Sequence, residues 1–172
     1  ETQEAISVAE DRMWKVLADE AATIDYNLQY MVGGISLSAL SSMRRIMGEN
    51  TMAPTNILMS LSFWSDIMEN FADKFDPVHQ YELFSTGELG SIMGLSFLTD
   101  GFRHPNLKVL ENDEMYLVAN PEFHGAYSDR GPVQSTEVDG RQQGVLARGW
   151  FMSERLSMAI LNPRSVIKAK RA

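Results

Sequence analysis

The sequence lacks cysteine, long apolar runs and a secretion signal. Because none of its 172 residues is cysteine, disulfide bonds and thiolate metal centres are excluded. No apolar run approaches the roughly 20 residues that a transmembrane helix requires. The N-terminal residues also lack the basic and then apolar segments of a secretion signal. We therefore predict a soluble protein with no membrane partner.

Basic residues are scarce as well. The chain has 15 Lys and Arg against 23 Asp and Glu, which gives a net charge of −8. A free-standing nucleic-acid-binding protein needs a basic face, so this balance argues against that class. The tail with Arg164, Lys168, Lys170 and Arg171 is locally basic, which allows for one basic surface. A hydrophobic content of 44% excludes general disorder, and the length allows one well-buried domain or two small lobes.

The N-terminal third has a helical period. Apolar residues recur at spacings of three and four from Glu4 to about Leu28, which predicts a long amphipathic helix that Gly33-Gly34 ends. Its predicted buried stripe is Ile6, Ala9, Met13, Leu17, Ala21, Ile24 and Leu28, with Trp14 beside it. The opposite face is predicted to meet solvent or another subunit and carries Glu10, Asp11, Lys15, Asp19 and Glu20.

Two further helices are predicted around one short apolar strand. Ser36 or Ser38 is a suitable N-cap for the first helix, and Ser62 for the second. The strand between them is apolar throughout, which is typical of the centre of a sheet. The predicted bounds are 36–47 for the first helix, 57–59 for the strand and 63–75 for the second helix.

Beyond residue 80 the sequence favours strands separated by glycine turns, so the chain as a whole is predicted to have an α+β fold. The predicted strands are Tyr81–Phe84, Ser91–Leu98, Lys108–Leu110, Met115–Ala119, Phe123–Tyr127, Trp150–Leu161 and Ser165–Lys170. Glu111–Glu114 is predicted to be a polar hairpin connection. Thr136–Gly144 is predicted to be an exposed loop.

The titratable side chains do not form a recognisable catalytic or metal-binding set. The three histidines (His79, His104 and His124) lack a paired ligand spacing and lie beside turn residues, so structural roles are expected. Four carboxylates are candidates for paired acid–base catalysis: Asp100, Asp113, Glu114 and Asp129. Because they occur in polar turns, we expect them to accept backbone hydrogen bonds instead.

Two further catalytic motifs are incomplete. GELGSIMG lacks the Lys-Ser/Thr ending of a phosphate-binding loop and leads into a strand. The serines near residue 62 do not occur in a Gly-x-Ser-x-Gly elbow. The predicted sets of catalytic, cofactor-binding and metal-binding residues are therefore empty, and we predict that the protein is not an enzyme.

Two arginines occur in predicted loops, each beside an acidic residue and a turn residue: Arg103 in DGFRHPN and Arg130 in YSDRGPV. The planar guanidinium group suits bidentate pairing with a carboxylate. The sequence leaves open whether that carboxylate belongs to the same chain or to another subunit. Together with Trp14, Asp11 and Lys15 of the long helix, these arginines are the predicted subunit-contact residues.

In the order of its elements the chain resembles the major capsid proteins of tailed double-stranded-DNA phages, whose fold encapsulin nanocompartments share. PTNILMSLSFWSDIM is similar to the family's Pro-x-x-Ile-Leu-Met-(Ser/Asn)-Pro passage, with Leu61 where proline is common. The Gly-rich strands ELGSIMGLSFLTDGFRHPNLKVL and MYLVANPEFHGAY follow in the family's order. The closing segment RGWFMSERLSMAILNPRSVIKAK completes the likeness.

The resemblance implies a domain division and a function. Residues 1–30 and 145–172 would form a peripheral domain with a spine helix and closing strands, and residues 31–144 an axial domain. The protein would form pentamers and hexamers of an icosahedral phage or prophage capsid around double-stranded DNA, bound without sequence specificity. Scaffold, protease and portal proteins are further partners that it implies. The expected location is the virion, and the host cytoplasm during assembly.

The alternatives are an encapsulin-type shell protein and, from another class, a small α/β hydrolase. A groove for a cargo peptide beside the long helix would favour the encapsulin. A buried polar pocket with His104 or His124 beside Asp100 or Asp129 would favour the hydrolase. The family's N-terminal arm and extended β-hairpin loop do not occur in these 172 residues. They are expected either upstream of Glu1 or removed by maturation.

Overall fold

The computed structural model describes residues 2–24, 27–31, 34–71, 91–92, 94–139 and 148–171. Its helices are α1 (Thr2–Ile24), α2 (Leu37–Glu49), α3 (Leu61–Phe71), η2 (Pro105–Leu107), α5 (Pro121–His124) and η4 (Pro163–Ser165). Its strands are β1 (Leu28–Met31), β2 (Pro54–Met59), β3 (Ser91–Ile92), β4 (Leu95–Thr99), β5 (Glu114–Ala119), β6 (Gly125–Asp129), β7 (Gln134–Asp139), β8 (Arg148–Ser153), β9 (Leu156–Ile160) and β10 (Val166–Arg171).

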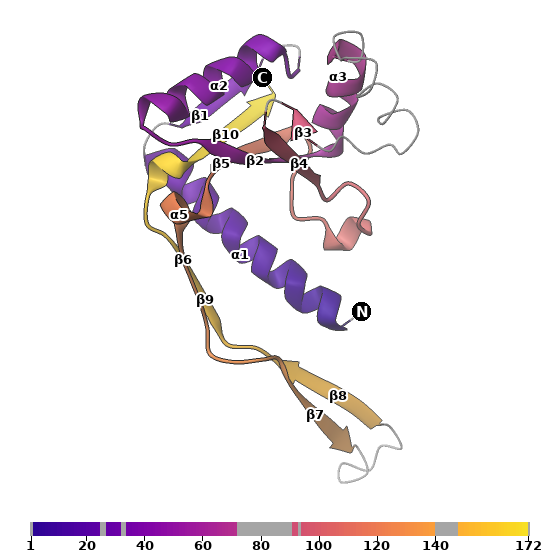
Figure 1. Cartoon of the computed structure of the whole chain (residues 1–172). Coiled ribbons are helices and arrows are strands. Elements are labelled where there is room, and N and C mark those ends of the chain that lie inside the picture. Colours follow the sequence, from indigo (N-terminus) through magenta and orange to yellow (C-terminus); the bar gives the residue numbers. More distant parts are fainter. Residues whose placement is uncertain are drawn as a thin grey trace.

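A six-stranded mixed sheet forms the body, in the order β1-β10-β5-β2-β4-β3. Strand β5 pairs antiparallel with both β10 and β2, whereas β2 pairs parallel with β4 and β1 pairs parallel with β10. Helices α2 and α3 lie on one face of this sheet and α1 on the other (Figure 1). The apolar segment 57–59 thus belongs to an interior strand, as predicted.

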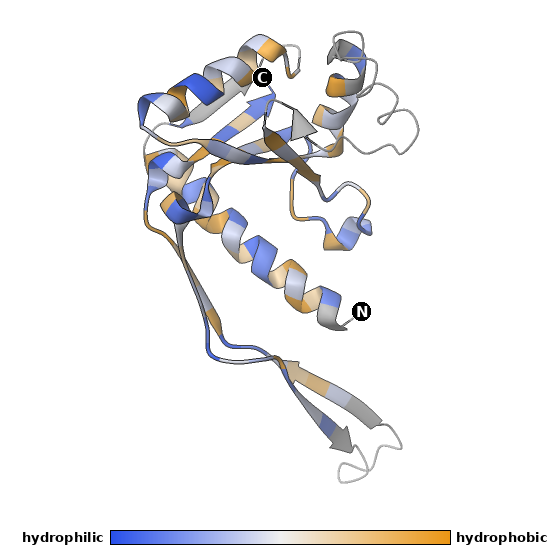
Figure 2. Ribbon diagram, in the orientation of Figure 1, coloured by the Kyte–Doolittle hydropathy of each residue, from blue (hydrophilic) through white to orange (hydrophobic). Residues whose placement is uncertain are grey.

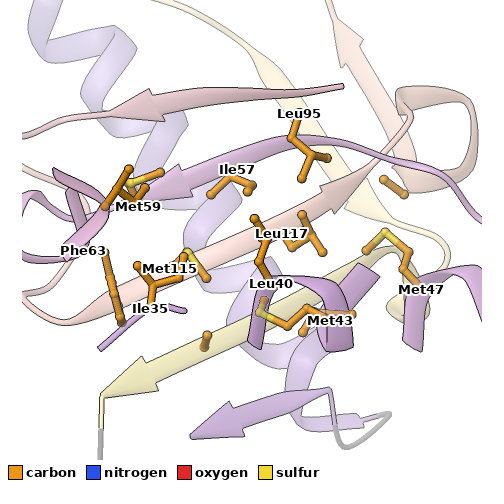
Figure 3. Close-up of a cluster of buried hydrophobic side chains, with 14 of the residues drawn as sticks. Ile35, Leu40, Met43, Met47, Ile57, Met59, Phe63, Leu95, Met115 and Leu117 are labelled. Carbon is orange, nitrogen blue, oxygen red and sulfur yellow. The ribbon is translucent and has the colours of Figure 1, made fainter. Parts of the chain in front are cut away.

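The face under α2 and α3 carries the larger core (Figure 3). Alternate residues of β2, β5 and β10 point toward these helices because side chains alternate between the two faces of a strand. The cluster comprises Ile35, Leu40, Met43, Met47, Met52, Ile57, Met59, Phe63, Ile67, Leu95, Met115, Leu117, Ala119, Ile167 and Ala169. On the other face, a smaller cluster joins Ala18 of α1 to Tyr116, Val118 and Val166.

Helix α1 exists as predicted, but its end and its buried face differ from the prediction. The helix ends at Ile24, and residues 28–31 form β1 instead of a last helical turn. The buried positions are Val8, Ala18, Ala21 and Ala22, whereas three large apolar residues, Met13, Val16 and Ile24, are exposed. The predicted stripe is therefore wrong for most of its length, because the side that meets the sheet carries Ala18 together with the charged Lys15 and Asp19.

The N-terminus of α2 agrees with the prediction and that of α3 does not. The Ser36 hydroxyl accepts a hydrogen bond from the Ala39 N–H group at 3.2 Å, as an N-cap does. Helix α3 begins at Leu61, one residue before the predicted cap. The Ser62 hydroxyl instead accepts a hydrogen bond from the Asp113 N–H group across the fold. The end predicted for this helix, residue 75, lies outside the described residues.

Several predicted strands need correction. Residues 108–110 form no strand, because the Val109 and Leu110 N–H groups both donate to the Asp100 carboxylate. Residues 121–124 form the short helix α5, and strand β6 begins only at Gly125. The predicted strand 150–161 is interrupted at residues 154 and 155. The predicted strand 81–84 lies outside the described residues.

The segment predicted to be a loop at 136–144 begins with a strand. Residues 134–139 form β7, which pairs antiparallel with β8, and β6 pairs in the same way with β9. These two pairs make one long two-stranded ribbon, which extends away from the body (Figure 1). Polar residues such as Thr136 and Glu137 suit this strand because residues 134–137 are all exposed.

The predicted domain division at residues 30 and 145 stays a prediction. Main-chain pairing crosses both boundaries, since β10 lies between β1 and β5 in one sheet. Within the described residues, no helix has the length and apolarity needed to cross a membrane.

Candidate subunit-contact surface

A buried ion network fixes α1 against the sheet. The Glu114 carboxylate of β5 is fully buried and lies 2.5 Å from Lys168 Nζ and 3.2 Å from Lys15 Nζ. Lys168 also pairs with Asp19 of α1. Removing one member of such a network leaves a buried charge without its partner, which makes the network decisive for the position of α1.

The pKa shifts in this network follow from its geometry. Burial by itself would raise the pKa of Glu114, but hydrogen bonds from Lys168 and from the Glu111 N–H group outweigh it and lower the pKa. For Asp19, hydrogen bonds from Lys168 and from the Tyr116 hydroxyl likewise outweigh the effect of burial and lower the pKa. Burial would lower the pKa of Lys15, but Glu114 and Asp19 raise it. The ionised network is therefore the stable form.

Arg103 pairs with a residue of its own chain. Its Nη1 atom lies 2.6 Å from Asp11 Oδ2, so the loop after β4 is fastened to α1. Asp100 supports the same loop by accepting the Val109 and Leu110 N–H groups at 2.6 and 2.8 Å. Arg103, Asp11 and Lys15 thus have partners within the chain, and their role between subunits stays a prediction.

Trp14 and His124 connect α1 with the start of the ribbon. Trp14 Nε1, which can only donate, lies 2.9 Å from His124 Nε2, so that nitrogen carries no proton. His124 Nδ1 then donates to Ser165 Oγ at 2.8 Å, and Ser165 donates to the Asn162 carbonyl at 2.6 Å. Burial lowers the pKa of His124. A neutral His124 therefore belongs to the native structure.

The His124–Ser165 pair is not suited to nucleophilic catalysis. Ser165 is fully buried and its proton is held by the Asn162 carbonyl. The nitrogen opposite the serine faces Trp14, where a catalytic triad requires a carboxylate. Neither Asp100 nor Asp129 lines the pocket that contains His124. The arrangement that would favour a hydrolase is therefore not found among the described residues.

An apolar pocket of about 380 Å³ lies beside α1 at the start of the ribbon. Leu17 of α1, Val118 of β5 and Met158 of β9 contribute to its walls. Gly125 begins β6 there, and a Cβ atom at that position would stand only 2.1 Å from the Ala159 carbonyl oxygen. Close approach of the two strands thus requires glycine at the start of the ribbon.

Large apolar side chains are exposed on α1, on the loop after β4 and along the ribbon. Coloured by hydropathy, these segments show apolar residues among polar ones (Figure 2). Val16 of α1 is 66% exposed, Trp150 of β8 is 64% exposed and Phe102 is 82% exposed. Tyr127 and Phe151 of the ribbon are exposed too. Exposed apolar side chains mark an interaction site where they form a contiguous patch.

The ribbon is also a structure that few contacts within its own chain stabilise. A two-stranded sheet is marginally stable in water at best, and both of its outer edges offer unpaired backbone groups. Every residue of β6 is exposed. Between β6 and β7, Arg130 lies opposite Arg155, and its N–H group donates to the Arg155 carbonyl at 3.0 Å. The sequence drew attention to Arg130 but not to Arg155, which becomes its neighbour only through strand pairing.

The remaining candidates have structural roles in the described part of the chain. His104 Nδ1 accepts the Asn106 N–H group, and Asp129 accepts the Gly131 N–H group, both as expected. Asp113 pairs with Arg171 at 3.1 Å. Glu114 was predicted to be a polar turn residue, which is wrong because it is buried at the start of β5. No cluster of three metal-ligating side chains occurs among the described residues, and His79 lies outside them.

Solved phage structures share this fold. A structure from Mycobacterium phage Che8 superposes with a TM-score of 0.59 at 13% identity, covering 96% of this chain and 58% of that chain. One from Mycobacterium phage Ogopogo gives 0.54 at 11% identity, covering 84% and 54%. A capsid structure of the cyanophage P-SCSP1u superposes at 0.48, which is too low for comparing folds.

The similarity is one of fold. No protein-family model and no curated protein matches the sequence. The chain spans little more than half the length of the two mycobacteriophage chains that it matches. The α+β fold predicted with the capsid resemblance is confirmed, with its long helix packed against a mixed sheet.

Proposed function

We propose that this chain is a structural subunit of an icosahedral phage or prophage capsid. Copies of it assemble into pentamers and hexamers that enclose double-stranded DNA. The fold shared with two phage structures supports the class. The charge of −8 is then borne on the outer surface or within interfaces, since the surface that faces DNA must be neutral or basic.

The ribbon is the observation that carries this proposal. A two-stranded ribbon with an exposed Trp150 and Phe151 cannot bury its apolar side chains within one chain. A second copy that packs on it removes that surface from water, and symmetry repeats the same contact around a ring. Each subunit then engages several partners, so individually weak contacts add up to a stable shell.

The test is imaging and light scattering of the full-length gene product. Closed particles of uniform diameter are expected. As a matched pair, Trp150→Ser removes an exposed apolar ribbon side chain, whereas Leu161→Ser removes one outside the strand pairs. Assembly should fall with the first substitution and remain with the second. A full-length product that stays monomeric at all concentrations contradicts the proposal.

An encapsulin-type shell is the second candidate, and one observation favours it. The apolar pocket beside α1 has the position expected of a groove for a cargo peptide. The contents of purified particles distinguish the two proposals. Nucleic acid, read from the ratio of absorbance at 260 and 280 nm, supports the capsid, whereas a single enclosed protein supports the encapsulin.

A further inference from the structure

A joint separates the two strand pairs of the ribbon, and the two chain segments that form this joint differ in length. The first pair ends at Asp129 opposite Leu156, and the second begins at Gln134 opposite Ser153. Residues 130–133 therefore face only residues 154 and 155. Gly131 has a φ of +138°, which favours glycine. Its N–H group donates to Asp129 Oδ1 at 2.9 Å, so the turn has a defined shape.

The joint places two arginines side by side. Arg130 and Arg155 are both exposed, and their backbones are linked by a hydrogen bond of 3.0 Å. Both line a polar pocket of about 240 Å³ with Gln134 and Ser153, and both line a second pocket of about 350 Å³. Each guanidinium group offers five N–H donors, and two like charges in one pocket are stabilised by an anion between them.

Neither arginine has a carboxylate partner among the described residues. Asp129, the acidic neighbour in sequence, is engaged with the Gly131 N–H group. Other arginines of the chain do have partners: Arg45 pairs with Glu49, and Arg103 pairs with Asp11. Arg130 and Arg155 differ from these arginines in that no carboxylate of the described part of the chain pairs with them, although the chain has an acidic excess.

We propose that Arg130 and Arg155 bind a carboxylate on a second copy of this chain. The proposal rests on the proposed function and names the chemistry of one subunit contact. Charge complementarity favours this occupant, because each copy carries 23 acidic residues against 15 basic ones. The joint lies on the ribbon, away from the six-stranded sheet of its own chain, so a neighbour can reach it (Figure 1). Duplex DNA, whose phosphates have the same charge, is the competing occupant.

Zero-length crosslinking tests the site in assembled particles. The double variant Arg130→Lys/Arg155→Lys keeps both charges and supplies amines that a carbodiimide couples to a carboxylate in contact. Light and ¹⁵N-labelled chains are mixed before assembly, and the linked peptides are identified by mass spectrometry. We expect position 130 or 155 of one isotope to be linked to an Asp or Glu of the other. Arg45→Lys is the control, because its partner Glu49 is in the same chain and gives links within one isotope.

A second pair of measurements separates the two occupants. Arg130→Gln/Arg155→Gln should raise the protein concentration needed for assembly at least about tenfold, since charge-assisted hydrogen bonds are lost at every contact between copies. Its affinity for a labelled DNA duplex, measured by fluorescence anisotropy, should equal that of the wild type. A drop in DNA affinity with unchanged assembly would assign the site to phosphate and overturn the proposal.

Two further outcomes separate a failure of this inference from a failure of the proposed function. Particles that assemble without any link between isotopes at these positions overturn this inference and leave the proposed function standing. A wild-type chain that never assembles overturns both. Because both arginines are exposed, neither double variant is expected to disturb folding.

Discussion

The six-stranded body and the ribbon of this chain differ in how much side-chain surface they bury. The body buries a cluster of fifteen apolar residues under α2 and α3, and holds α1 on its other face with buried ions. None of the ribbon side chains that the structure describes is fully buried; alternate residues of β9 are half-buried, and tryptophan, phenylalanine and tyrosine are exposed. Under the proposed function, this difference separates the surfaces that serve folding from those that serve contact between subunits.

The largest effect on stability is expected at the ion network in the body. Glu114→Gln leaves Lys168 and Lys15 beside a neutral group in a buried place, so we expect a loss of roughly 3–5 kcal/mol in the free energy of unfolding. Urea unfolding followed by circular dichroism measures it. The exposed Glu122→Gln of α5 is the control and should change stability by less than about 0.5 kcal/mol. Equal stability of both variants would mean that the network does not hold α1.

The junction of the two regions is tested at Gly125. A Cβ atom there would meet the Ala159 carbonyl oxygen at 2.1 Å, so Gly125→Ala must push β6 and β9 apart. We expect a loss of about 1–3 kcal/mol. Gly48→Ala in α2 is the matched control, because no atom lies within 4 Å of its new Cβ. That substitution should stabilise the helix by up to about 1 kcal/mol. A neutral Gly125→Ala would show that the strands approach less closely than described.

The features that the sequence predicted correctly depend on local signals. The Ser36 cap and the interior strand at residues 57–59 can be identified from neighbouring residues alone. The buried face of α1 could not be identified in this way, because Glu114 and Lys168, which orient the helix, are far from it in sequence. Strand β7 has no apolar alternation, and its residues 134–137 are all exposed. Arg155 was overlooked for a related reason: only strand pairing brings it beside Arg130.

Lowering the pH is a weaker test of the contact that His124 makes between body and ribbon. Because burial lowers the pKa of His124 below its ordinary 6.5, the unfolded chain binds this proton more readily than the folded one. Stability due to His124 is therefore complete above pH 6.5 and falls as the pH drops below it, by at most about 1.4 kcal/mol per pH unit. Urea midpoints between pH 7.5 and 5.5 measure the slope, which should be shallower in His124→Gln. Identical slopes would exclude His124 as the titrating group.

The smallest effect on stability is expected on the ribbon itself. Trp150 is 64% exposed on β8, so Trp150→Ser should change the free energy of unfolding by less than about 0.5 kcal/mol. The same substitution should nevertheless reduce assembly, because the proposed contact buries the indole surface against a neighbouring subunit. Unfolding and light scattering on one preparation separate the two effects. A large loss of stability in the monomer would mean that Trp150 packs within its own chain, and the contrast between body and ribbon would then fail.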